Sequence, residues 1–261
     1  MTTAAQAGGG RLSTATVAAA TIAVALGCWI LVARRMQGMD MGPGTDLGSL
    51  SFFVGAWVTM MAAMMLPSAL PMVLLFDRVS RGQRAAGRTA PSTVVFVAAY
   101  LVVWTLFGLA AFGLYRLVRD AGLGFLAWDR QGPLVAGTAV AAAGIYELTP
   151  LKNVCLRHCR GPLHFVLGGW RPGTRGAVRM GAEHGTVCVG CCAGLMVVLF
   201  AVGVMSVTWM LVVTAVVFAQ KVLPFGQRLR LPGAAALVGL GVWIAVAAST
   251  VPGLTTPGGM M

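Results

Sequence analysis

The stretch that decides the fold is Phe52–Phe76, FFVGAWVTMMAAMMLPSALPMVLLF, in which no side chain carries a charge. An α-helix rises about 1.5 Å per residue and the hydrocarbon core of a bilayer is about 30 Å thick, so a run of this length can cross it. Pro67 and Pro71 are expected to kink this helix. Similar apolar runs occur throughout the chain, so the sequence predicts an all-α, polytopic membrane helix bundle.

These runs predict about seven transmembrane helices. Their approximate bounds are Thr14–Ala33, Phe52–Phe76, Thr93–Tyr115, Pro133–Leu148, Val187–Met205, Val207–Gln220 and Pro232–Val251. A single helix over Val187–Gln220 would overshoot the bilayer, and Gly203, Ser206 and Thr208 can supply a turn that divides it.

The composition excludes an ordinary water-soluble protein. Apolar residues make up 58% of the chain and charged residues 10%, whereas soluble domains contain about 25% charged residues. We expect one membrane domain over residues 14–251. It would lie between a disordered N-terminus, residues 1–13, and a disordered Gly/Pro/Thr-rich tail, residues 252–261.

The net charge of +12 fits membrane topology better than nucleic-acid binding, because the basic residues lie between apolar runs and Lys and Arg hold loops in the cytoplasm. With seven spans and a cytoplasmic N-terminus, 14 of the 19 basic residues lie inside. They are Arg11, Arg78, Arg81, Arg84, Arg88, Lys152, Arg157, Arg160, Arg171, Arg175, Arg179, Lys221, Arg228 and Arg230. We therefore expect a multi-pass protein of the cell inner (plasma) membrane, with the lipid bilayer as a partner and no nucleic acid.

Five of the six cysteines lie in two short groups together with two histidines. The groups are Cys155-Leu-Arg-His158-Cys159 and His184-Gly-Thr-Val-Cys188-Val-Gly-Cys191-Cys192. They flank the basic segment between the fourth and fifth predicted spans, at the cytoplasmic ends of both. Reducing conditions there would leave the thiols free for metal or redox chemistry.

The spacing brings several of these residues to one helix face. If the fifth helix begins a turn early, His184, Cys188, Cys191 and Cys192 follow one another at steps of three and four. A closed site of four thiolates suits structural Zn(II), whereas two or three thiolates fit Cu(I). The alternatives are thiol redox chemistry and simple packing, and packing is the expectation for Cys28, which is alone in the first span.

Methionines form two further groups of candidate soft ligands. Met60 and Met64 are one helical turn apart in the second span, as are Met61 and Met65. Their thioethers could pass Cu(I) along the helix, although methionine also packs well as a flexible apolar residue. The outer loop adds Met36, Met39 and Met41.

Two smaller features concern packing in the region of the cysteines. Glu147, near the end of the fourth span, is expected to pair with Lys152, with a place in the metal site as the alternative. Gly190 and Gly194 form a small-x-x-x-small pattern, which would let another helix approach the fifth span closely.

Two signatures resemble a known family. One is Trp57-Val-Thr-Met60-Met61-Ala-Ala-Met64-Met65-Leu-Pro67, and the other runs from Cys155-Leu-Arg-His-Cys through Trp170-Arg-Pro-Gly to His184-Gly-Thr-Val-Cys188-Val-Gly-Cys191-Cys192. The chain is similar over Phe52–Lys221 to a bacterial family of predicted metal-binding integral membrane proteins, a domain of unknown function of which some members are labelled copper chaperone. This resemblance implies a metal-binding role for Cys155, Cys159, Cys188, Cys191 and Cys192.

We therefore expect a membrane protein that is not an enzyme. It would bind a soft metal, copper as Cu(I) with zinc as the alternative, at the cysteines, His158 and His184, aided by Met60 and Met64. Delivery to a membrane metalloenzyme or a copper carrier protein would follow. The rival functions are a thiol oxidoreductase that uses Cys188 and Cys191, and a subunit of a metal transporter.

The topology can be tested with an impermeant thiol reagent on intact cells. In a variant that lacks the native cysteines, Ser49→Cys should be labelled because it lies in the outer loop, and Thr174→Cys should not. The opposite pattern would reverse the orientation assigned from the basic residues.

Overall fold

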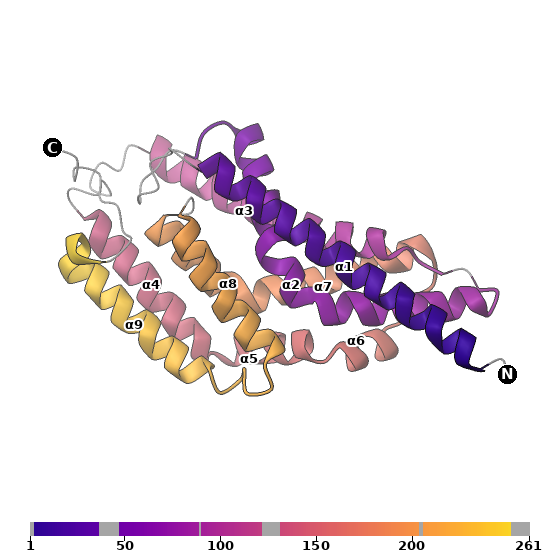
Figure 1. Ribbon diagram of the computed structural model, residues 1–261. Coiled ribbons are helices and arrows are strands. Elements are labelled where there is room, and N and C mark those ends of the chain that lie inside the picture. The colour runs from indigo at the N-terminus through magenta and orange to yellow at the C-terminus, as the bar shows by residue number, and fades with distance from the viewer. Residues whose placement is uncertain (1–2, 37–46, 89, 122–130, 204–205, 252–261) are drawn as a thin grey trace.

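The computed structural model describes residues 3–36, 47–88, 90–121, 131–203 and 206–251, and within them the chain is helical with no strand (Figure 1). The helices are α1 (Thr3–Met36), α2 (Leu50–Ala85), α3 (Thr93–Asp120), α4 (Gly132–Leu148), α5 (Pro150–Arg160), α6 (Pro162–Gly168), α7 (Gly173–Val202), α8 (Val207–Val222) and α9 (Arg230–Ala247), followed by a 3₁₀ turn, η2 (Ala248–Thr250). The all-α prediction is confirmed. Helix α1 begins within the segment predicted to be disordered, while the predicted disordered tail lies outside the described residues.

Five of the described helices are long and apolar enough to cross a membrane: α1, α2, α3, α7 and α9. A sixth span arises if α4 and α5, which meet at an angle of 64°, are counted together. The predicted count of about seven is therefore not confirmed. The reason is length, because α4 has 17 residues and α8 has 16, against the roughly 20 that a straight span needs.

The predicted division of Val187–Gln220 is confirmed. Helix α7 ends at Val202 and α8 begins at Val207. The break is made at Gly203, whose φ of 114° is readily adopted only by glycine. Thr208, expected to contribute to the turn, lies inside α8.

The basic segment expected to be a loop between the fourth and fifth spans is mostly helical. Helix α5 begins at Pro150, with the Thr149 hydroxyl capping its first turn by accepting from Lys152 N. Helix α7 begins at Gly173 rather than near Val187. The cysteines of α7 consequently lie midway along a long helix and not at its end, which corrects the predicted location.

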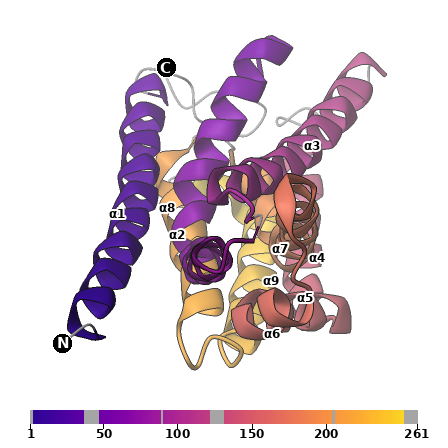
Figure 2. The same ribbon diagram turned by 90° about the vertical axis from the view of Figure 1, so that its right-hand side faces the viewer.

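Helices α2 and α7 form the centre of the bundle. In their most apolar segments 61% and 56% of residues are buried, against 28% in α3, 17% in α9 and 11% in α1. Figure 2 shows the first half of α2 from the side and its second half nearly end-on, so the helix bends, as Pro67 and Pro71 predict. The outward apolar faces of α1, α3 and α9 are suited to contact with lipid.

Glycines allow the outer helices to pack closely. A methyl group at Gly181 of α7 would lie 2.3 Å from the carbonyl oxygen of Phe96 in α3. One at Gly137 of α4 would lie 2.4 Å from the carbonyl oxygen of Gly241 in α9. Because any Cβ at these positions would clash with backbone, the two crossings depend on glycine.

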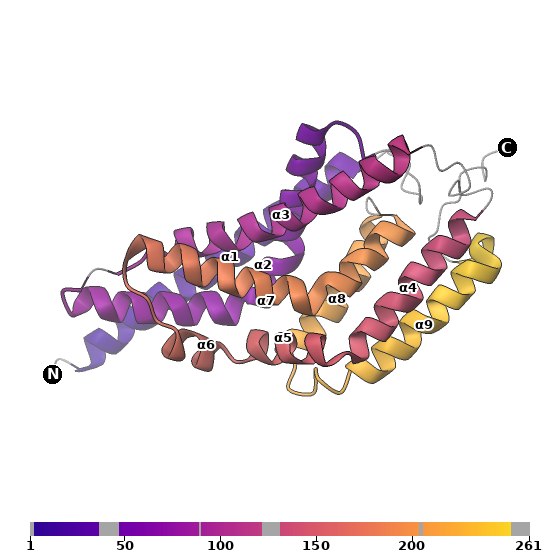
Figure 3. The same ribbon diagram turned by 180° about the vertical axis from the view of Figure 1, so that it is seen from behind.

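Three helix ends that carry arginines lie at one end of the molecule. Figures 1 and 3 show the N-terminal end of α1, the C-terminal end of α2 and the N-terminal end of α7 close together there. If the arginine-rich segments lie on one side of the membrane, these helix ends must lie together, as they do here.

A buried ion pair links α4, α5 and α8. Lys152 Nζ donates to Glu147 Oε1, and neither side chain is exposed to solvent. Gln220 Nε2 donates to the other carboxylate oxygen over 2.8 Å. The Arg230 guanidinium donates to the Glu147 carbonyl oxygen at 2.7 and 2.9 Å. The predicted pairing of Glu147 with Lys152 is confirmed.

Glu147→Gln should destabilise the bundle, because it leaves the Lys152 ammonium buried without a counter-charge. Loss of one partner of a buried pair costs about 3–5 kcal/mol. Thermal unfolding in detergent measures the effect. The matched control is Glu183→Gln, since Glu183 bonds Arg171 and Arg179 with 40% of its side chain exposed and should contribute at most about 1 kcal/mol. Equal melting temperatures for the two variants would contradict the assignment.

Candidate metal centre

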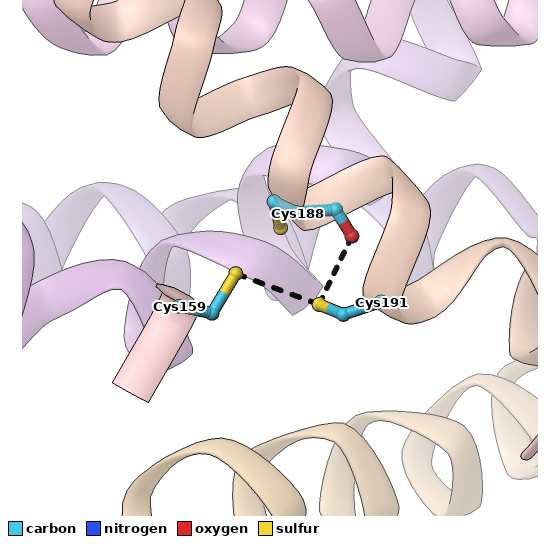
Figure 4. A group of neighbouring side chains, drawn as sticks. All are labelled: Cys159, Cys188 and Cys191. Carbon is cyan, nitrogen blue, oxygen red and sulfur yellow. Dashed lines mark hydrogen bonds between the residues drawn. The ribbon is translucent and has the colours of Figure 1, made fainter. Parts of the chain in front are cut away.

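Three cysteine thiols from two helices converge in the interior. Cys159 comes from α5, and Cys188 and Cys191 come from α7. Their Sγ atoms all lie within 4.8 Å of one another. Figure 4 shows the three side chains close together. We call these three residues the thiol trio. Cys188 and Cys191 are almost fully buried, whereas Cys159 is partly exposed.

The helical period of α7 brings its thiols to the buried face. His184, Cys188, Cys191 and Cys192 are all less than 4% exposed, as their spacing predicts. Cys191 Sγ lies 3.5 Å from Cys159 Sγ and 3.4 Å from Cys192 Sγ. All six cysteines of the chain are free, so the thiols remain available as ligands.

The approach of α4 and α5 to α7 depends on two glycines of α7: Gly194 faces α4 and Gly190 faces α5. A methyl group at Gly190 would lie 2.7 Å from Cys155 Sγ, and one at Gly194 would lie 3.0 Å from the Tyr146 ring. The Tyr146 hydroxyl donates to the Gly190 carbonyl oxygen at 2.5 Å. The predicted close approach at Gly190 and Gly194 is therefore confirmed, and it sets the distance between Cys159 and the thiols of α7.

Cys188 has two polar neighbours that the sequence did not reveal. Lys221 of α8 donates from Nζ to Cys188 Sγ over 2.9 Å, and the Tyr100 hydroxyl of α3 lies 3.0 Å from the same sulfur. Lys221 is only 8% exposed. A buried ammonium requires a negative partner, and Cys188 supplies one when it is a thiolate. The sequence signal for this contact was a lysine near the end of an apolar run. The charge pattern assigned this lysine to a cytoplasmic loop.

Three of the predicted ligands lie apart from the thiol trio. Cys155 contacts Gly190. His158 is exposed, and its Nδ1 lies 2.9 Å from the Val154 carbonyl oxygen, within its own helix. His184 stacks on Tyr100 with ring centroids 5.4 Å apart. His184 and Cys159 both line one small cavity.

The methionines of α2 lie in the same apolar core as the thiols. Met60 and Met64 are each 1% exposed and belong to the cluster that contains Cys188, Cys191 and Cys192. Their burial fits both a packing role and a ligand role, so the role of Met60 and Met64 stays a prediction. Met36 is buried as well, while Met39 and Met41 lie outside the described residues.

Comparison with protein families matches residues 54–244 to PpoB2, a family described as a copper chaperone. The match extends from α2 into α9 and includes every member of the thiol trio. The chain belongs to the PpoB2 copper chaperone family. No curated protein and no solved structure matches it. The resemblance found in the two sequence signatures is thus confirmed at the level of the family.

The donor set of this PpoB2 member suits a soft metal ion. Thiolates select ions such as Cu(I) and Zn(II) over hard ions such as Mg²⁺ or Ca²⁺. Structural zinc takes four protein ligands in a tetrahedron, whereas the group of mutually close ligand atoms in the described residues has three. Beside this group, Cys192 Sγ lies 3.4 Å from Cys191 Sγ.

Lys221→Met should weaken Cu(I) binding. Three thiolates and one Cu(I) ion carry two net negative charges, and the buried ammonium offsets one of them. We expect a loss of about tenfold in affinity, or about 1.4 kcal/mol, in competition with a chelator of known affinity. Lys221→Arg is the control, because it keeps the charge and should bind like the parent. Tighter binding by Lys221→Met would contradict this role.

Proposed function

We propose that the chain is an integral membrane protein that binds Cu(I) at Cys159, Cys188 and Cys191 and passes it to a partner metalloprotein. The observation that carries this proposal is the convergence of three thiols from two separate helices into a space of 4.8 Å. Membership of the copper chaperone family supports copper as the cargo. The chain acts in binding and exchange and not as an enzyme.

The arrangement favours exchange of the ion over a permanent structural site. Other contacts hold the helices together, namely the Glu147–Lys152 pair and the glycine crossings at Gly181 and Gly137. One ligand of the trio, Cys159, is partly exposed and borders a cavity. An ion bound there can therefore leave without the fold being opened.

The proposed setting is the cell inner membrane, with the N-terminus in the cytoplasm. Five membrane-length helices support the bilayer as the surroundings. The basic segments support the orientation. In this orientation a cytoplasmic copper carrier or a membrane metalloenzyme would exchange ions with the thiol trio.

Cys191→Ser should lose Cu(I) binding while the helices stay folded. Cys188→Ser should lose Cu(I) binding too, with a lower melting temperature, because it also removes the sulfur that Lys221 contacts. Serine is nearly the same size as cysteine, and the stability of the bundle comes from helix packing and satisfied backbone groups. Chelator competition measures binding, and thermal unfolding in detergent measures the fold. Cys28→Ser, distant in sequence and partly exposed, is the control and should match the parent in both measurements.

The same experiment separates the rival functions. A structural zinc site would unfold when a ligand is lost, because metal binding is then part of the folding free energy. A thiol oxidoreductase would form a disulfide in these helices and bind no metal. Binding should also weaken as the pH falls, since the thiols must lose their protons to bind the ion. Cu(I) binding that persists in both serine variants would refute the proposal.

A further inference from the structure

A partly open cavity of about 140 Å³ lies beside the thiol trio, with Cys159 in its lining. Cys159 of α5, His184 of α7 and Lys221 of α8 line it, together with Ala69 and Met72 of α2. At about 30 Å³ for each water molecule, the cavity could hold a few waters or one small ion, but no peptide. Cys159 is the member of the trio that belongs to both the cavity and the thiol cluster.

Three side chains with soft donor atoms lie in the lining of this cavity. Met72 offers a thioether, His184 an imidazole and Cys159 a thiol, and all three types bind Cu(I). Met72 and His184 are 2% and 3% exposed, so both lie on the inner part of the wall. The bend of α2 at Pro67 and Pro71 brings Ser68, Ala69, Pro71 and Met72 to the cavity.

The charges at the cavity favour an anionic complex over a free cation. Arg160 and Lys221 line it, and its lining contains no acidic residue. Arg160 also borders an open surface basin of about 600 Å³, which Arg228 and Phe225 share. A Cu(I) ion carried by two thiolates has a net negative charge and would be attracted to these arginines, whereas hydrated cations would be repelled.

We propose that this cavity is the uptake route for Cu(I), that the ion arrives as an anionic thiolate complex at the Arg160–Arg228 basin, and that Cys159 is the first thiol of the trio to bind it. This proposal deepens the proposed function and rests on it. In the exchange, a bond forms between Cu(I) and Cys159 Sγ as one bond to a donor thiolate breaks. The proton of the Cys159 thiol passes to the released donor thiolate. Copper remains Cu(I), so no oxidant is needed.

A larger side chain in the lining of the cavity tests the route without removing any candidate ligand. Ala69 and Ala62 are both on α2 and both 5% exposed, but only Ala69 lines the cavity. Ala69→Leu should slow loading from Cu(I)–glutathione by about tenfold or more, equivalent to about 1.4 kcal/mol in the barrier. The amount of Cu(I) bound at equilibrium should be unchanged. Ala62→Leu is the matched control and should load like the parent.

A second measurement does not depend on the folding of a variant. The unaltered, metal-free protein is treated with a small methanethiosulfonate reagent, and each cysteine is followed by mass spectrometry. Within the trio, Cys159 should react first, and Cys188 and Cys191 should lag.

The outcomes separate the two proposals. Parent-like loading by Ala69→Leu, equal slowing by Ala62→Leu, or earlier modification of Cys188 or Cys191 would each overturn the uptake route alone. Absence of Cu(I) binding in the unaltered protein would overturn the proposed function itself, and with it the route.

Discussion

Positive charge buried among apolar helices must be balanced, and two lysines impose this constraint on the bundle. Lys152 pairs with the Glu147 carboxylate, while Lys221 donates to the Cys188 sulfur. The two arrangements meet on α8, because Gln220, next to Lys221, donates to Glu147. The thiol trio is therefore tied to the electrostatics that hold α4, α5 and α8 together.

The sequence predicted which residues share the buried face of α7, but not which cysteine of α5 lies closest to them. His184, Cys188 and Cys191 follow a helical period, so their common face could be read directly. Cys155 and Cys159 are one turn apart and equivalent in sequence, so either could have joined the thiols of α7. The choice depends on a contact between helices, the meeting of Cys155 with Gly190, which a local pattern does not contain.

The number of membrane-length helices and the burial of Lys221 were not predicted correctly, for related reasons. Hydropathy measures the apolar character of a run but does not distinguish a short apolar helix such as α8, with 16 residues, from a full span. In the same way, a charge pattern treats every lysine as a loop residue. Lys221 is instead buried beside a thiol, which only the packing of α8 against α7 reveals.

Gly190 has no side chain, and this controls the distance between α5 and α7 at the thiol trio. Because a single methyl group there would press on Cys155, the backbone of α7 sets how near α5, and with it Cys159, can come to the other two sulfurs. A larger side chain at this position would thus change the spacing of the thiol trio without contacting any of its three sulfurs. Relatives of this protein could adjust how firmly they hold their cargo by substituting small residues on the contact face of α7, while every ligand stays the same.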